Sequence, residues 1–227
     1  MPGYLCRVRP LVTPGVYAPQ DDTDLLAGAL SEEPLPPGAH VLDVGTGTGA
    51  LALAAARRGT RVTAIDLSWR AVWTARVNAR LAGLPVHIRQ GNLFAPVRGQ
   101  SFDLILSNPP YVPAPSVRVR PHSAARAWDA GHDGRLVLDR ICREVPGLLR
   151  PGGVLLMVHS ALSDPDRTLG RLRDAGLKAA VTRRRRITFG PVLRSRAEWL
   201  RGRGLVSASE ESEEKEELVV VRAELPV

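Results

Sequence analysis

The sequence predicts an α/β protein with a seven-stranded, mostly parallel sheet, an antiparallel last strand and helices on both faces. From residue 40 onward, short apolar runs alternate with helical segments, which is typical of a parallel sheet covered by helices. The chain has 227 residues, 44% of them hydrophobic, which is enough for one sizeable core. The last two apolar runs lack a helical crossover, which favours an antiparallel final strand.

The first 39 residues are rich in prolines and turn formers, and we assign residues 1–39 to an N-terminal extension that precedes a main domain of residues 40–227. Asp21 and Asp22 resemble an acidic helix start, and residues 23–30 are expected to form a short amphipathic helix behind them.

In the main domain, runs of β-branched and aliphatic residues predict the strands and alanine- or leucine-rich stretches predict the helices. Ser68 is suited to cap the second of these helices. The expected strands are 41–44, 61–66, 86–89, 102–107, 154–159, and stretches near 179–188 and 218–224. The expected helices are 50–58, 68 to about 82, about 134–149, and 164–176.

The net charge of +8 comes almost entirely from arginine. A basic surface suits nucleic acid, a ribosome or an acidic protein, although a general arginine bias explains it equally well. Four consecutive arginines at 183–186 are better explained as an exposed edge strand guarded by charge than as an RNA-binding patch. The acidic run at 210–217 is typical of a solvated loop between strands.

Several classes of protein are disfavoured by composition. Cys6 and Cys142 lie far apart, and no Cys/His cluster has metal-ligand spacing, so we expect no metal. Residues 1–10 lack the apolar core of a signal peptide, and no apolar run approaches membrane-spanning length. We therefore expect a cytoplasmic protein that does not bind a membrane.

A glycine-rich turn after the first strand predicts a nucleotide-like ligand. Gly45, Gly47 and Gly49 let the backbone approach a ligand closely, and the following helix offers free N–H groups. Asp66, at the end of the second strand, can accept both hydroxyls of a ribose. This pattern fits NAD and S-adenosylmethionine equally well. A turn without any ligand is disfavoured, because the strand, the glycines and Asp66 all occur at the spacing that such a binding site requires.

Asp43 favours S-adenosylmethionine, because a carboxylate before the glycines suits its amino group or sulfonium end and would repel a pyrophosphate. Asn92 and Leu93, after the third strand, are placed to meet the adenine, although Asn92 also suits a loop cap. The residues expected to bind the cofactor are Asp43, Gly45, Thr46, Gly47, Gly49, Asp66, Leu67, Asn92, Leu93 and Asn108.

The stretch Asn108-Pro109-Pro110-Tyr111 follows the fourth strand and predicts methylation of a planar NH2 group. The Asn108 side-chain oxygen and the Pro109 carbonyl can each accept one N–H and so orient the nitrogen for attack on the methyl group. The prolines hold the backbone rigid, and Tyr111 can cover the flat acceptor. An ordinary strand-ending turn is the less favoured alternative. The proline-rich loop at 112–131 is expected to be a substrate lid.

Three stretches of this chain resemble the HemK/PrmC class of protein-glutamine N5-methyltransferases. They are the S-N-P-P-Y-V-P sequence at 107–113, the W-D-A-G-H-D-G sequence at 128–134, and the G-V-Y-A-P-Q-D-D-T sequence at 15–23, in which Asp21 replaces the usual Glu. The resemblance implies the Rossmann-like class I methyltransferase fold, S-adenosylmethionine as cofactor, and the glutamine of the Gly-Gly-Gln motif of peptide-chain release factors as substrate. It also implies that Asn108 and the Pro109 carbonyl bind the substrate amide, with Gly45, Gly47, Asp66 and Asn92 on the cofactor.

Longer members of this class carry an N-terminal helical domain, for which the 39 residues before the first core strand are too few. The chain resembles the compact branch, whose eukaryotic members act with a small activating partner. Two other functions stay open. One is methylation of a base of rRNA, tRNA or DNA of the adenine-N6 type, and the other is a non-catalytic ribosome or release-factor adaptor.

Overall fold

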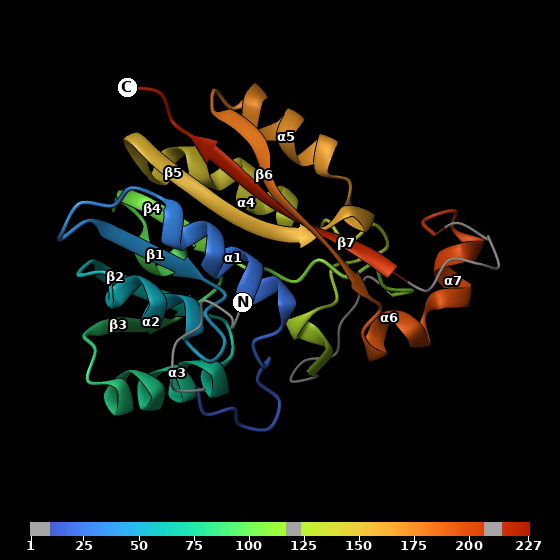
Figure 1. Ribbon diagram of the computed structural model, residues 1–227, viewed down its shortest axis with the longest axis horizontal. Coiled ribbons are helices and arrows are strands. Elements are labelled where there is room, and N and C mark those ends of the chain that lie inside the picture. The colour runs from blue at the N-terminus through green and yellow to red at the C-terminus, as the bar shows by residue number, and fades with distance from the viewer. Residues whose placement is uncertain (1–9, 117–123, 207–214) are drawn as a thin grey trace.

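The computed structural model describes residues 10–116, 124–206 and 215–227, and these form a central sheet between two layers of helices (Figure 1). The strand order is β3-β2-β1-β4-β5-β7-β6. The strands are β1 His40–Val44, β2 Arg61–Asp66, β3 Val86–Gln90, β4 Phe102–Ser107, β5 Leu149–Ser160, β6 Lys178–Thr188 and β7 Lys215–Glu224. Neighbours from β3 to β5 are parallel, and β7 is antiparallel to both β5 and β6. The predicted fold class is confirmed, and the antiparallel last strand lies inside the sheet.

Helices cover both faces of the sheet, as expected (Figure 1). The helices α1, α2 and α3 pack side by side in one layer, while α4 and α5 contact each other in the other. The helices are α1 Asp21–Glu32, α2 Ala50–Ala56, α3 Trp69–Ala82, α4 Leu138–Glu144, α5 Pro165–Asp174, α6 Pro191–Ser195 and α7 Ala197–Gly202. The short helices α6 and α7 lie in the connection between β6 and β7.

Three sequence-based boundaries are wrong for identifiable reasons. The helix expected at 134–149 is only α4, because Gly134 adopts a left-handed conformation before it and a 3₁₀ turn, Val145–Leu148, containing a proline follows it. The strand β5 begins at Leu149 rather than at 154, since Leu149 already pairs with Phe102 of β4, ahead of a register irregularity. The acidic run does not end in a loop, because Lys215–Glu217 belong to β7 and Glu216 is buried; its residues 210–214 lie outside the described ranges.

The four arginines expected on an edge strand are on β6, which is an edge of the sheet. Arg183 pairs with Glu32 and Arg185 with Asp21, so two of them tie the strand to α1. Arg184 pairs with Glu217 on β7, with 2.6 Å between the charged atoms. Charge on this edge therefore joins it to neighbouring elements and discourages pairing with another strand.

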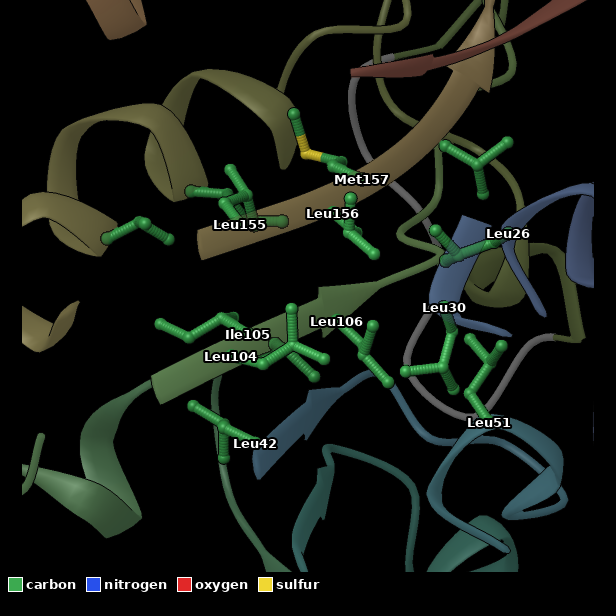
Figure 2. Packing of buried hydrophobic residues seen from close by; sticks show 14 of the residues in the cluster. Leu26, Leu30, Leu42, Leu51, Leu104, Ile105, Leu106, Leu155, Leu156 and Met157 are labelled. Atoms are coloured by element: carbon green, nitrogen blue, oxygen red, sulfur yellow. The ribbon is translucent and has the colours of Figure 1, made fainter. Parts of the chain in front are cut away.

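The helix α1 belongs to the core. Leu26 and Leu30 are fully buried and lie over Leu106 and Leu156 of the sheet, beside Leu51 of α2 (Figure 2). Burial of such a large aliphatic face stabilises the position of α1 by the hydrophobic effect. The first turn of α1 is consequently held at the end of β4 that carries the predicted catalytic residues.

Candidate active site

The predicted site residues lie at or directly after the carboxyl ends of β1, β2, β3 and β4, and these ends meet at one edge because the strands are parallel. In the turn after β1, Gly45, Gly47 and Gly49 have φ of +76°, +55° and +86°. Side chains with a Cβ rarely adopt such angles, so this path of the backbone requires glycine. The Gly45 and Thr46 N–H groups donate to the Ile65 carbonyl at 2.9 and 3.0 Å, which fixes the turn against β2.

Asp66 is brought to this turn by the end of β2. Its Oδ2 accepts the Gly47 N–H at 2.9 Å, and its Oδ1 accepts the Ser68 N–H at 2.8 Å. Burial raises the pKa of Asp66, while the Ser68 and Gly47 N–H groups oppose this shift by favouring the carboxylate. A half-buried carboxylate held by two backbone donors is pre-positioned to accept further hydroxyl donors.

Asp43 lies beneath the turn and is 1% exposed. Its Oδ2 accepts from the Thr46 hydroxyl at 2.6 Å and from the Ala52 N–H of α2 at 3.1 Å. Burial raises the pKa of Asp43 to about 7, against the effect of these two donors. Its Oδ1 is buried and has no hydrogen-bond partner among the described residues. One oxygen therefore supports the turn, and the other is an unused acceptor.

The residues predicted to meet an adenine lie at the outer part of this edge. Asn92 is exposed, and its Oδ1 accepts from Arg140 Nη1 at 3.1 Å. Leu93 has a φ of +48°, which is uncommon for a side chain of this size. Leu67 is 46% exposed and follows Asp66 directly. The structure thus places these three beyond the ends of β2 and β3. The contact of Asn92 and Leu93 with an adenine, and that of Leu67 with the cofactor, stay predictions.

Asn108 lies directly after β4, next to the glycine turn. A Cβ at Gly45 would lie 3.7 Å from the Asn108 carbonyl oxygen, so the two backbones face each other. The Ser107 hydroxyl donates to the Val44 carbonyl at 3.0 Å and fixes the two strand ends together. The Asn108 side chain is half-buried, and its Nδ2 donates to the Thr23 hydroxyl oxygen at 3.3 Å.

The first turn of α1 completes this site, which the sequence did not predict. Asp22 is 3% exposed, and its Oδ2 accepts the hydroxyls of Tyr17 at 2.8 Å and Tyr111 at 3.0 Å. Its Oδ1 accepts from Thr23, at 2.6 Å from the backbone nitrogen and 3.1 Å from the hydroxyl. Burial raises the pKa of Tyr111 well above its ordinary value, and the negative charge of Asp22 raises it further. The phenol is therefore a neutral donor anchored to α1.

An acidic helix start is an ordinary capping signal, which is why Asp22 and Thr23 were not predicted to be site residues. The signal that could have identified them is the 15–23 stretch, which carries part of the family resemblance and contains both residues. The structure places the Tyr17 carbonyl 3.8 Å from where a Cβ of Gly47 would lie, so this stretch crosses the glycine turn.

The loop after Tyr111 has a fixed base. Val112 exchanges backbone hydrogen bonds with Trp128 and Ala130, at 2.8 and 3.0 Å. A Cβ at Gly134 would lie 2.3 Å from the Tyr111 carbonyl oxygen, so only glycine fits there. The Ser163 hydroxyl donates to that same carbonyl at 2.6 Å. The stretches 107–113 and 128–134, which both carry the family resemblance, therefore meet through backbone contacts.

Arg196, between α6 and α7, joins this loop base to the β6–β7 connection. It donates to the Pro113 carbonyl at 3.0 Å and pairs with Asp129 at 2.7 Å. Residues 117–123 of the predicted lid lie outside the described part of the chain, so the lid stays a prediction.

Within the described residues, no three His, Cys, Asp or Glu side chains are grouped as metal ligands. In the same part of the chain, no helical segment has the length and hydrophobicity that a membrane span requires.

Comparison with known proteins shows which family the chain resembles. Residues 10–122 match the family model described as methyltransferase small domain. A Methanocaldococcus jannaschii protein named as a protein N5-glutamine methyltransferase is 34% identical over 177 residues, covering 78% of this chain and 88% of the relative. The release factor glutamine methyltransferase of Deinococcus radiodurans is 44% identical over 151 residues, covering 63% of this chain but only 52% of that relative. The chain thus spans most of the archaeal relative and about half of the bacterial one.

A solved structure from E. cuniculi has the same fold over its whole length. It is the Mtq2-Trm112 complex, described as methylating the translation termination factor eRF1. The similarity covers 93% of this chain and 99% of that chain, with a TM-score of 0.66 and 25% identity. The 16S rRNA N2 G1207 methyltransferase of T. thermophilus also shares the fold, with a TM-score of 0.61 and 20% identity over 94% of this chain and 46% of that one.

Proposed function

This chain belongs to the family of protein-glutamine N5-methyltransferases, and we propose that it transfers a methyl group from S-adenosylmethionine to the side-chain nitrogen of a glutamine. We propose the Gly-Gly-Gln motif of a peptide-chain release factor as the substrate, supported by the names of the bacterial relatives. The observation that carries the proposal is the position of Asn108-Pro109-Pro110-Tyr111 at the end of β4, beside the glycine turn.

The residues of the turn fit S-adenosylmethionine. Its left-handed glycines leave the backbone open to a ligand. The buried Oδ1 of Asp43, which has no hydrogen-bond partner in the described part of the chain, is an acceptor suited to a positively charged group. The same carboxylate is poorly suited to a pyrophosphate. Asp66 would hold the ribose hydroxyls, and Asn92 and Leu93 would meet the adenine. When bound, this cofactor supplies an electrophilic methyl group on a positively charged sulfur.

The acceptor side of the reaction depends on Asn108 and the backbone after it. The lone pair of an amide nitrogen is delocalised, so the nitrogen must be held and oriented before it attacks. The Asn108 Oδ1 and the Pro109 carbonyl would each accept one N–H, which fixes the plane of the NH2 group and favours the positive charge that develops on nitrogen. The prolines restrict this backbone, so the acceptors need little reorganisation during the reaction.

A second candidate substrate is a base of rRNA or tRNA, of the adenine-N6 type, because the same two acceptors suit an exocyclic amine. The observation that favours it is the arginine-rich edge strand, where Arg184 and Arg186 are exposed. Phosphate contacts by such side chains would add affinity that falls with salt. We rank it second because the family relatives are named for protein methylation.

We also propose that a small activating partner assists this chain. The E. cuniculi protein is described as a complex with Trm112, and the structural similarity extends over 99% of the matched chain. A protein that modifies release factors would work in the cytoplasm, where translation termination takes place.

Methyl transfer to defined substrates tests the proposal. The purified chain, alone and with a Trm112-like partner, is incubated with labelled S-adenosylmethionine and a release factor, its Gly-Gly-Gln→Gly-Gly-Ala variant, or ribosomal RNA. Label in the native factor that is absent from the alanine variant supports the proposal. Label in RNA alone establishes the second candidate, and label that persists in the alanine variant overturns the glutamine assignment.

A further inference from the structure

We propose that Thr23, itself oriented by Asp22, is a positioning residue that determines which atom of the Asn108 side-chain amide faces the acceptor nitrogen. This inference rests on the proposed function, since it concerns the same site. It goes beyond that function by assigning a role to the first turn of α1. The relay consists of Asn108 Nδ2, the Thr23 hydroxyl and Asp22 Oδ1.

The orientation of Asn108 matters because its two terminal atoms have opposite capacities. The amide oxygen accepts hydrogen bonds, whereas the amide nitrogen only donates. A substrate NH2 group can be held by the oxygen but would be repelled by the nitrogen. The two orientations of the side chain have nearly the same shape, so packing alone does not choose between them. A hydrogen-bond partner of defined direction is needed.

Thr23 supplies that direction because of its own neighbour. Its hydroxyl has a single proton and lies 3.1 Å from Asp22 Oδ1. Asp22 receives two phenols, one backbone N–H and this hydroxyl, a set of donors that matches the acceptor-only carboxylate. With its proton committed to Asp22, the Thr23 oxygen can only accept, and the atom 3.3 Å away must be the donor of the Asn108 amide.

The consequence is that Asn108 Oδ1 is turned away from α1 and kept as an acceptor. Among the described residues it accepts no hydrogen bond. Asp22 and Thr23 are buried, at 3% and 5% exposure, and Asn108 is half-buried. Water therefore competes little for the hydrogen bond between Thr23 and Asp22. Asp22 also anchors Tyr111, and the same carboxylate thereby holds both ends of the catalytic stretch.

The test compares Thr23→Val with Thr23→Ser in two backgrounds. Valine keeps the shape of threonine without the hydroxyl, whereas serine keeps the hydroxyl. With native Asn108, we expect Thr23→Val to lower kcat about tenfold, the effect of losing one orienting hydrogen bond, and Thr23→Ser to retain most of it. In the Asn108→Asp background both terminal atoms are acceptors, so orientation no longer matters. In that background Thr23→Val should lower kcat about twofold or less, since both orientations of the substituted carboxylate present an acceptor to the substrate.

A matched control is Thr13→Val, which removes a hydrogen bond between the Thr13 and Thr74 hydroxyls, 2.6 Å apart, in the same N-terminal segment.

A second measurement is independent of substrate. In nitrogen-15 spectra, the Asn108 side-chain NH2 signals are assigned by their absence in Asn108→Asp. Their solvent exchange should accelerate in Thr23→Val and stay slow in Thr23→Ser and Thr13→Val. An equal loss of kcat in both backgrounds, or NH2 exchange unchanged by Thr23→Val, would overturn the relay. If the native chain labels no release factor, the proposed function fails, and the exchange data alone then decide for or against the relay.

Discussion

The hydroxyl of Tyr111 donates to the carboxylate of Asp22 at 3.0 Å, across 89 positions of sequence. This hydrogen bond joins the proposed catalytic stretch, Asn108–Tyr111 after β4, to the first turn of α1. Because α1 is buried against β5, β6 and β7, the stretch is held by the core itself. The first turn of α1 is therefore a structural part of the candidate active site.

Removing this hydrogen bond should affect stability and catalysis together. Tyr111→Phe leaves Asp22 with one phenol donor fewer, and hydrogen bonds to a charged group contribute about 1.5–3 kcal/mol. We expect the unfolding free energy to fall by about 2 kcal/mol in urea titrations, with a several-fold lower kcat. Tyr17→Phe is the matched control, because its hydroxyl binds the same oxygen at 2.8 Å from outside the catalytic stretch. Tyr17→Phe should lower the unfolding free energy by a similar amount but lower kcat less than Tyr111→Phe does. Equal losses of kcat in the two variants would contradict the prediction.

Cofactor affinity should depend on Asp66 and not on a carboxylate outside the site, such as Asp103. Calorimetry with S-adenosylhomocysteine is expected to show binding to the native chain and roughly tenfold or more weaker binding to Asp66→Ala, since the ribose would lose its acceptor. Asp103→Ala is the control, because this carboxylate accepts from His40 and Arg150 at the opposite end of the sheet. Tight binding of NAD, with no response to S-adenosylhomocysteine, would be incompatible with the cofactor assignment.

The sequence predicted the parts of the fold and site that local patterns encode. Periodic apolar runs predicted the sheet, and turns with glycine or Asn-Pro predicted where Gly45 and Asn108 would lie. The antiparallel last strand was expected because the sequence indicated no helical crossover before it, and the pairing of β7 with β5 confirms it. The connection does contain two short helices, α6 and α7, which the sequence patterns did not predict. Such features depend on residues close together in the chain.

The features that sequence reasoning missed depend on distant contacts. Asp22 looks like any acidic helix start until α1 is packed on the sheet, where Asp22 meets Tyr111. Glu216 lies in an acidic run that is typical of a loop, yet β7 extends through it and buries its side chain. Gly134 looks like a helix start, and only the approach of the Tyr111 carbonyl explains why no side chain fits there. Tertiary contact overrides the local signal in each case.

The burial of Glu216 predicts a pH-dependent stability. Burial raises its pKa to about 7, a hydrogen bond with Ser160 opposes the shift, and the negative charge of Asp22 adds to it. The folded state therefore binds this proton more tightly than the unfolded state. The resulting stabilisation is complete below the ordinary pKa of 4.5 and is lost as the pH rises through about 7.

The substitution Glu216→Gln removes this titration. Relative to the native chain, its unfolding free energy should rise between about pH 5 and pH 8 by on the order of 2–3 kcal/mol, as measured by urea unfolding at each pH. Glu217→Gln is a control for the neighbouring position, where the side chain pairs with Arg184 on the surface. If the stability difference between the native chain and Glu216→Gln does not change with pH, this carboxyl has no raised pKa.

The ion pair of Arg196 with Asp129 should matter for the substrate and not for the cofactor. Arg196→Met removes the link between the loop base and the α6–α7 connection, and it leaves the Asp129 carboxylate without its partner. Breaking an ion pair that is largely buried, as this one is, should lower the free energy of unfolding by about 3 kcal/mol or less. We expect a several-fold higher KM for the macromolecular substrate and an unchanged Kd for S-adenosylhomocysteine. Arg194→Met, in the same connection, is the comparison, and an equal rise in KM there would point to a general charge effect.

The sharpest prediction concerns Asn108. If its oxygen is one of two acceptors for the substrate NH2 group, Asn108→Ala should lower kcat by about 10²–10³, which is typical of losing one preorganised hydrogen bond in an active site. Cofactor affinity should change much less, because the glycine turn and Asp66 are intact. Asn108→Asp keeps an acceptor at both terminal atoms and should retain part of the activity that alanine loses. The assay uses a release factor with Gly-Gly-Gln and its Gln→Ala form as the control. Full activity of Asn108→Ala would refute the mechanism, because the Pro109 carbonyl alone would then suffice to orient the amide.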